Sequence, residues 1–175
     1  MTTIAETGVA TQTYCVYVKA TPDEIWDAIT NPDRTDEYGY RGRVEYELEA
    51  GGAYRAHASD VMRATGSPDV IIDGEVLEFE PGRKLFQTWN PLFDPEITAE
   101  PATLLTFEIS PGEIPWSPDV TRLTVTHEVD GAPLTAALVG GSVPGAGGGW
   151  AFVLSDLKTL LETGSALPCV PVEGC

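Results

Sequence analysis

The chain has 175 residues and no long polar linker, so we expect one domain over 1–175, with a core at 13–164 and tails at 1–12 and 165–175. Ten Lys and Arg residues stand against 27 Asp and Glu residues, and the formal net charge of −17 repels nucleic acid and anionic membrane surfaces, which excludes both as expected partners. The N-terminal stretch lacks a basic segment followed by an apolar run, and no apolar stretch reaches the roughly 18 residues of a spanning helix. A cytoplasmic protein without membrane insertion is therefore predicted.

The first elements are a strand and a capped helix. Residues 13–19 alternate apolar and polar side chains with a period of two, which predicts a strand. Thr21-Pro22-Asp23-Glu24 then combines an N-cap threonine, a proline at the first helical position and a capping-box glutamate, so a helix begins there. Asn31-Pro32 ends this helix, and the same pair can cap a second short helix through 34–38.

A run of short alternating segments follows, with turn residues between them. This pattern is typical of an antiparallel meander, and the predicted strands are 42–49, 52–63, 70–79, 83–90, 102–110 and 120–130. Longer loops are expected at 90–101 and 112–118. The glycine-rich stretch 132–148 is interpreted as a mobile surface loop.

The last predicted element is a long helix over 149–164, which ends at a glycine suited to a left-handed cap. Its apolar stripe is Trp150, Val153, Leu154, Leu157, Leu160 and Leu161, and its polar side is Ser155, Asp156, Lys158, Thr159 and Glu162. One face of a sheet formed by such a meander must be covered by another element, and this helix has the apolar surface to do so. The sheet is therefore expected to curl around the helix.

Several motifs along the chain resemble one family. They are Ala20-Thr21-Pro22-Asp23-Glu24-Ile25-Trp26-Asp27-Ala28, Thr30-Asn31-Pro32, Gly51-Gly52, Gly74-Glu75-Val76-Leu77-Glu78, Pro81-Gly82-Arg83-Lys84-Leu85, Thr88-Trp89, Thr121 to Glu128, and Gly149-Trp150 leading to Leu157-Lys158. Their order and spacing are similar to the START-like or helix-grip superfamily, in the branch of activators of heat-shock protein 90 ATPase. The resemblance implies an α+β fold of six or seven antiparallel strands wrapped around the C-terminal helix, with two short helices after the first strand.

The resemblance also implies a cavity between sheet and helix for an apolar or aromatic small molecule. The inward positions that would line it are Trp26, Tyr54, Met62, Trp89, Phe107, His127, Trp150, Leu154 and Leu157. Aromatic residues in such positions are more often plain core, which is the alternative interpretation. Members of the superfamily include ligand carriers, polyketide cyclases and chaperone regulators, so a cyclase or dehydratase and a co-regulator acting through its acidic surface stand as alternatives. Either a monomer or a homodimer is compatible with the sequence.

Few residues in the sequence are candidates for a catalytic role. His127 shares an apolar strand face with Leu123 and Val125, so it either acts as a proton shuttle, oriented by Asp60 or Tyr54, or is a hydrogen-bonded core histidine. His57 is placed on the outer, solvated face of its strand.

No cofactor motif or metal site is expected. Glu45, Glu47 and Glu49 alternate on one strand face and are interpreted as solvated. Cys15, Cys169 and Cys175 are too scattered for a zinc site, and reduced thiols are favoured over a Cys169–Cys175 bridge.

Overall fold

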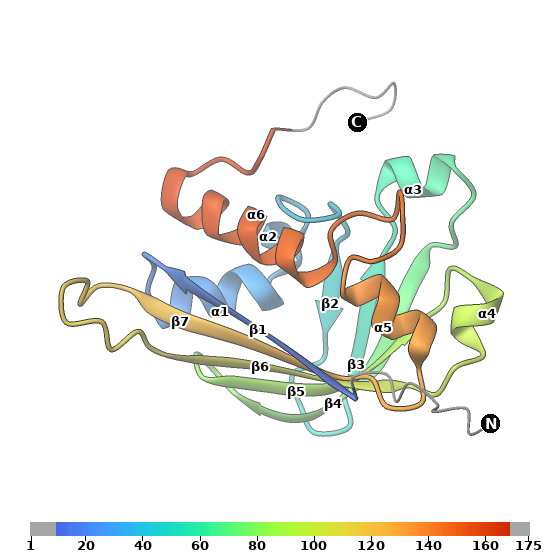
Figure 1. Cartoon of the computed structure of the whole chain (residues 1–175), viewed down its shortest axis with the longest axis horizontal. Coiled ribbons are helices and arrows are strands. Elements are labelled where there is room, and N and C mark those ends of the chain that lie inside the picture. Colours follow the sequence, from blue (N-terminus) through green and yellow to red (C-terminus); the bar gives the residue numbers. More distant parts are fainter. Residues whose placement is uncertain (1–9, 169–175) are drawn as a thin grey trace, which may run out of the picture.

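A computed structural model describes residues 10–168 and shows an α+β fold built on one antiparallel sheet of seven strands in the order β1-β7-β6-β5-β4-β3-β2. The strands are β1 (Thr11–Val18), β2 (Val44–Tyr46), β3 (Ala53–His57), β4 (Val70–Glu80), β5 (Lys84–Pro91), β6 (Thr103–Pro111) and β7 (Thr121–Glu128). The sheet curves around the long C-terminal helix (Figure 1). The predicted helix-grip fold is therefore confirmed, with strand ends that differ by a few residues from the expected ones.

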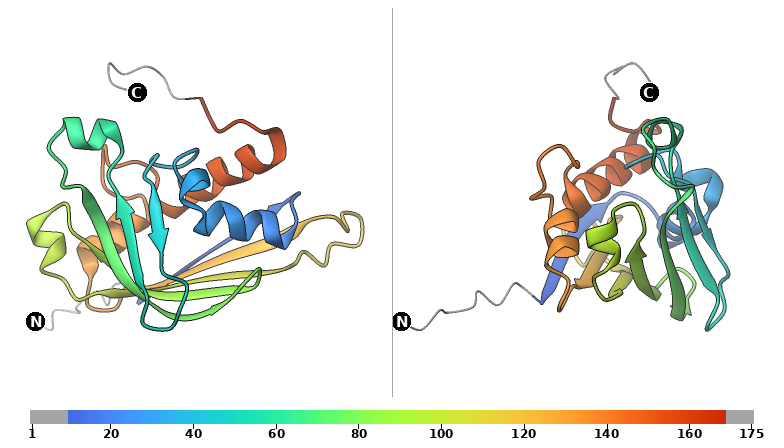
Figure 2. Two further views of the ribbon diagram at one scale, coloured as in Figure 1. Left: turned by 180° about the vertical axis from the view of Figure 1, so that it is seen from behind. Right: turned by 90° about the vertical axis from the view of Figure 1, so that its right-hand side faces the viewer.

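The helices are α1 (Pro22–Thr30), α2 (Pro32–Thr35), α3 (Asp60–Ala64), α4 (Pro95–Thr98), α5 (Pro133–Val139) and α6 (Gly149–Thr163). Helices α1 and α6 lie over the concave face of the sheet, and α3 and α4 lie at the opposite end of the molecule from the β6–β7 turn (Figures 1 and 2). No helix within residues 10–168 is both long and apolar enough to cross a membrane. The possible Cys169–Cys175 bridge lies outside the described residues.

The start of α1 forms for the local reasons predicted. The Thr21 backbone amide donates to the Glu24 carboxylate at 2.7 Å, and the Glu24 amide donates to Thr21 Oγ1 at 3.2 Å, which completes a capping box. Asn31 ends α1 and its side chain then caps α2 by accepting from the Asp33 amide at 2.9 Å. The second short helix is therefore present, but it begins two residues earlier than 34–38 and ends at Thr35.

The strand predicted over 52–63 is wrong in its second half. Strand β3 ends at His57, and Ser59 caps helix α3 by accepting a hydrogen bond from the Met62 amide at 3.3 Å. Period-two alternation does not continue through a helix, so Asp60 and Met62 do not share an inward face with Tyr54. The Asp60 side chain is 96% exposed and pairs with Arg63, whereas Met62 is half-buried against the core.

The stretch interpreted as a mobile loop contains helix α5, so that interpretation is wrong for Pro133–Val139. The helix lacks a local side-chain cap. The Glu100 carboxylate takes that place by accepting from the amides of Leu134 at 2.7 Å and Thr135 at 2.8 Å, and from the Thr135 hydroxyl. A carboxylate at these first amides satisfies donors that would otherwise have no partner.

Replacing Glu100 with alanine is expected to lower the free energy of unfolding by about 2 kcal/mol, because two helix-end amides and one buried hydroxyl lose their acceptor. Urea denaturation measures the loss. Hydrogen exchange at the Leu134 and Thr135 amides should become faster in the same variant. The Glu108→Ala control, at an exposed site on β6, should be close to wild type. Equal stability of the two variants would contradict this capping role.

Helix α6 carries the predicted apolar stripe and ends at Gly164, whose φ of +79° is the expected left-handed cap. Asp156, however, was placed on the polar side and is fully buried. Its carboxylate accepts from the amides of Gly39 at 2.8 Å and Leu167 at 2.6 Å, and it lies 3.8 Å from the Arg41 guanidinium. The first residues of the expected C-terminal tail are thus hydrogen-bonded to α6 through Leu167.

Candidate functional site

A row of paired residues that includes the polar side chains of Gln12, His127 and Gln87 crosses the inner face of the sheet. Cross-strand pairing aligns Gln12 with His127, His127 with Leu105, Leu105 with Gln87, and Gln87 with Val76. His127 and Gln87 have no exposed surface. Because buried polar groups are costly unless they are hydrogen-bonded, the partners of these two residues decide what the row can do.

Both ring nitrogens of His127 have partners. The Trp150 indole donates to Nδ1 at 3.1 Å, and Thr103 Oγ1 lies 2.7 Å from Nε2. An indole N–H can only donate, so Nδ1 is the acceptor and the ring proton is on Nε2. Thr103 Oγ1 then accepts a hydrogen bond from Nε2–H and donates one to the Trp89 carbonyl at 3.0 Å. The result is a directed chain of hydrogen bonds that requires a neutral imidazole.

Burial lowers the pKa of His127 from 6.5 to about 4. Protonation at Nδ1 would also place a new N–H against the Trp150 indole N–H. Trp89 contacts the imidazole edge-on, with ring centroids 5.0 Å apart. The hydrogen-bond partners of His127 are thus Trp150 and Thr103, whereas Asp60 or Tyr54 was the expected partner of a proton shuttle.

Gln87 is the second polar centre of the row, and its hydrogen bonding is incomplete. Its Oε1 accepts from the Tyr46 hydroxyl at 2.9 Å, whereas its Nε2 has no partner. Rotating the amide by 180° would let Nε2 donate to the same hydroxyl and leave Oε1 without a partner, so one amide atom stays unsatisfied in either orientation.

A pair of stacked tyrosines provides the hydroxyl partner of this amide. Tyr46 and Tyr54 stack with ring centroids 4.8 Å apart. Burial raises the pKa of both phenols, which keeps their hydroxyls protonated and able to donate. The Gln87 end of the row therefore presents an unsatisfied amide beside two aromatic rings.

The predicted ligand-binding residues mostly gather in the core. Six are buried: Tyr54, Trp89, Phe107, His127, Leu154 and Leu157. Trp26, Met62 and Trp150 are half-buried against them. Gln87, Tyr46 and Thr103 join this group and were missed. The signal for Gln87 was present, since Gln87 alternates with Leu85 and Trp89 on one strand face, but glutamine at such a position gives no sign of whether it has a partner.

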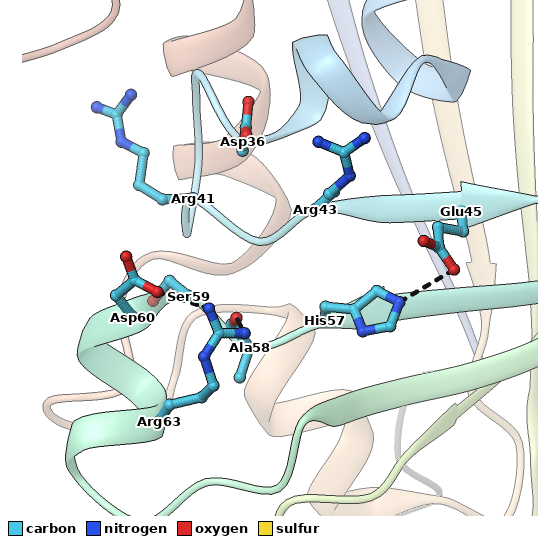
Figure 3. Close-up of a pocket in the computed structure, with 9 residues that line it drawn as sticks. All are labelled: Asp36, Arg41, Arg43, Glu45, His57, Ala58, Ser59, Asp60 and Arg63. Atoms are coloured by element: carbon cyan, nitrogen blue, oxygen red, sulfur yellow. Dashed lines mark hydrogen bonds and ion pairs between the residues drawn. The ribbon is translucent and has the colours of Figure 1, made fainter.

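A separate charged cleft of about 370 Å³ lies on the outside of the sheet, between the segment before β2, the end of β3 and α3 (Figure 3). Its charged lining is Asp36, Arg41, Arg43, Glu45, His57, Asp60 and Arg63. His57 does lie outside the core as predicted, but it is not freely solvated. Its side chain is 20% exposed and its ring nitrogens lie 3.2 Å from Glu45 and 3.4 Å from Asp69. Glu45, Glu47 and Glu49 are exposed, as predicted.

A curved antiparallel sheet gripping a C-terminal helix, with an aromatic and polar inner face, defines a helix-grip protein. Residues 19–162 match the family model described as activator of Hsp90 ATPase homolog 1-like protein. The chain belongs to this family, as its motifs indicated. No curated protein matches the chain.

Solved structures share the fold at low sequence identity. The crystal structure of CalU16 from Micromonospora echinospora has a TM-score of 0.60 and 19% identity, over 88% of this chain and 77% of that one. DynU16, described as a putative protein in the dynemicin biosynthetic locus, has a TM-score of 0.61 and 22% identity, over 90% of this chain and 49% of that one. PFC0360w, an HSP90 activator from Plasmodium falciparum, has a TM-score of 0.57 and 16% identity, over 87% of this chain and 96% of that one.

Proposed function

We propose that this protein binds a small apolar or aromatic molecule between the sheet and α6, and that a hydrogen-bond acceptor on the molecule pairs with the Gln87 amide. The observation that carries the proposal is the unpartnered Gln87 Nε2 at a residue with no exposed surface. An unsatisfied buried donor costs about 1–3 kcal/mol, and a ligand acceptor would recover that free energy. Tyr46, Tyr54 and Trp89 supply the aromatic surroundings that small-molecule sites usually have.

Gln87 has no exposed surface in this conformation, so a ligand must displace side chains to reach it. Strand β2 is the segment best suited to move, because it has three residues, lies at the sheet edge and pairs only with β3 among the strands. It carries Tyr46, the hydrogen-bond partner of Gln87. Outward movement of β2 would therefore also release Oε1 of the amide, whose Nε2 already lacks a partner. Short edge strands have the fewest ladder hydrogen bonds to break.

Gln87→Leu tests the proposal, since leucine keeps most of the volume and removes the amide. Wild type and variant are titrated with aromatic polyketides and fatty acids by native mass spectrometry. For a ligand with a carbonyl or hydroxyl acceptor, the variant should bind about ten- to a hundredfold more weakly, which is the loss of one buried hydrogen bond. Thr106→Val, a half-buried site on the neighbouring strand whose side chain faces outward, serves as the matched control and should bind like wild type.

Two results would contradict the proposal. One is that no compound in the series is retained by wild-type protein. The other is equal affinity of wild type and Gln87→Leu, especially if the variant also gains stability, because that pattern marks Gln87 as a buried, unsatisfied amide that contacts no ligand.

A polyketide-cyclase reaction centred on His127 draws less support from the geometry. His127 is unexposed and neutral, both its nitrogens are engaged, and Asp60 lies on the surface. The co-regulator alternative draws on the family and on the charge of −17, which would steer a basic partner to the surface.

A further inference from the structure

The turn between β6 and β7 presents a tryptophan to solvent. Trp116 is 84% exposed, whereas the other exposed large hydrophobic side chains among residues 10–168 are only 36–41% exposed. Trp26, Trp89 and Trp150 belong to the core or pack against it. The turn extends beyond the neighbouring strands at the end of the molecule remote from α3, α4 and α5 (Figures 1 and 2). An aromatic ring in this position adds little to the stability of the fold.

Hydrogen bonds between backbone atoms fix the shape of the turn that carries Trp116. The Gly112 amide donates to the Val120 carbonyl at 2.9 Å at the base. Nearer the tip, Ile114 and Ser117 form a bridge, and the Ser117 amide donates to the Ile114 carbonyl at 2.9 Å. Pro115 and Trp116 occupy the two corner positions of this tight turn, and proline fixes the backbone just before the tryptophan. The ring is therefore carried on a preorganised support, which reduces the entropy lost on binding.

The two charged side chains within the turn are both negative. Glu113 and Asp119 are exposed, and residues 111–121 contain no Lys or Arg. A partner for this tip should combine an apolar pocket for the ring with basic residues around it, because like charges at an interface rim are unfavourable and opposite ones steer association. Aromatic anchors of this kind carry much of the affinity in protein interfaces.

The chain has an apolar cleft of its own beside α4, of about 700 Å³, whose lining includes Pro68, Leu92, Phe93 and Pro95. A second copy could in principle receive Trp116 there. Asp94 and Glu96 adjoin that cleft, however, so an acidic tip would meet an acidic rim, and each chain carries a net charge of −17. Charge therefore favours a different, basic protein over self-association.

We propose that residues 112–120 form a docking loop, whose Trp116 inserts into an apolar pocket rimmed by Lys and Arg on another protein. Glu113 and Asp119 pair with that rim. Glu113 has a φ of +54°, a conformation that non-glycine residues seldom adopt, and it is held there within a turn that serves no packing role in the core.

The experiment has two stages, both on the full chain. A photo-crosslinking aromatic amino acid at position 116 identifies the protein that the ring contacts in cells, and that protein is then purified and titrated. Wild type should bind it with an affinity that Trp116→Ala lowers by roughly 30-fold, as for a central aromatic anchor. Glu113→Lys with Asp119→Lys should also weaken binding and reduce its dependence on salt. Leu134→Ala, at an exposed hydrophobic residue of α5, is the matched control and should bind normally.

Three outcomes would overturn the proposal. The first is the absence of any crosslinked protein, or a crosslinked protein bound equally by wild type and Trp116→Ala. The second is a wild-type dimer at low ionic strength that Trp116→Ala dissociates, which would assign the tip to the α4 cleft of a second copy. The third is Trp116-dependent binding to phosphatidylcholine vesicles, which would assign the tip to a lipid surface.

Discussion

Replacing Asp156 with alanine is expected to lower the free energy of unfolding by about 3–5 kcal/mol, the largest effect of any single substitution considered for this protein. The carboxylate is unexposed and joins three separate parts of the chain: α6 itself, the turn at Gly39 and the C-terminal segment at Leu167. Its loss leaves two backbone amides without acceptors and the Arg41 guanidinium without its counter-charge. Urea denaturation monitored by circular dichroism measures the change.

The Asp156 effect has a local signature as well. Because Leu167 donates to Asp156 and its carbonyl accepts from Arg41 at 3.2 Å, the segment 165–168 should be cleaved faster by proteases in the variant. Asp156→Asn should fall between wild type and alanine, since the amide keeps one acceptor oxygen. Ser155→Ala, at the preceding exposed position of α6, is the matched control. If Asp156→Ala lowered the free energy of unfolding by less than about 1 kcal/mol, as an ordinary surface substitution does, the role of Asp156 in joining these three segments would be contradicted.

The stability of wild-type protein should depend on pH through His127. In the folded state its pKa is about 4, compared with 6.5 as the reference value. Between these two values the unfolded chain binds the extra proton, so stability contributed by the neutral imidazole is complete above about pH 6.5 and falls as pH drops toward 4. The difference between these two pKa values corresponds to a loss of unfolding free energy on the order of 3 kcal/mol.

His127→Gln isolates this contribution. The variant should be less stable than wild type at pH 7, because the chain from Trp150 through His127 to Thr103 is disturbed, and the two unfolding free energies should converge as pH falls to 4.5. Carboxylate titration is common to both proteins and cancels in the difference. Thr103→Val removes the partner of Nε2 and keeps the imidazole, so it should be destabilised yet retain the pH dependence. A constant difference between wild type and His127→Gln over this range would show that His127 does not titrate as the structure indicates.

Local patterns along the chain determined the framework. The capping box at Thr21, the alternation in β1, β5 and β7, and the glycine cap at Gly164 each depend on residues a few positions apart, and the structure shows all of them where predicted. The family also followed from such motifs, and the family model matches residues 19–162. Backbone propensity and side-chain period act over one or two turns, so a sequence displays them directly.

Tertiary contacts decided the rest. Helix α5 depends on Glu100, 35 residues before Thr135, and Asp156 is buried because it binds Gly39, 117 residues away. The role of His127 rests on Trp150 and Thr103, and the unsatisfied state of Gln87 on the reach of Tyr46 from another strand. A polar side chain in a core is tolerated only with partners, and those partners are brought to it by the fold. The sequence by itself therefore determined most of the strands and the helices α1 and α6, whereas the three-dimensional packing decided whether helix α5 forms and which buried polar groups have partners.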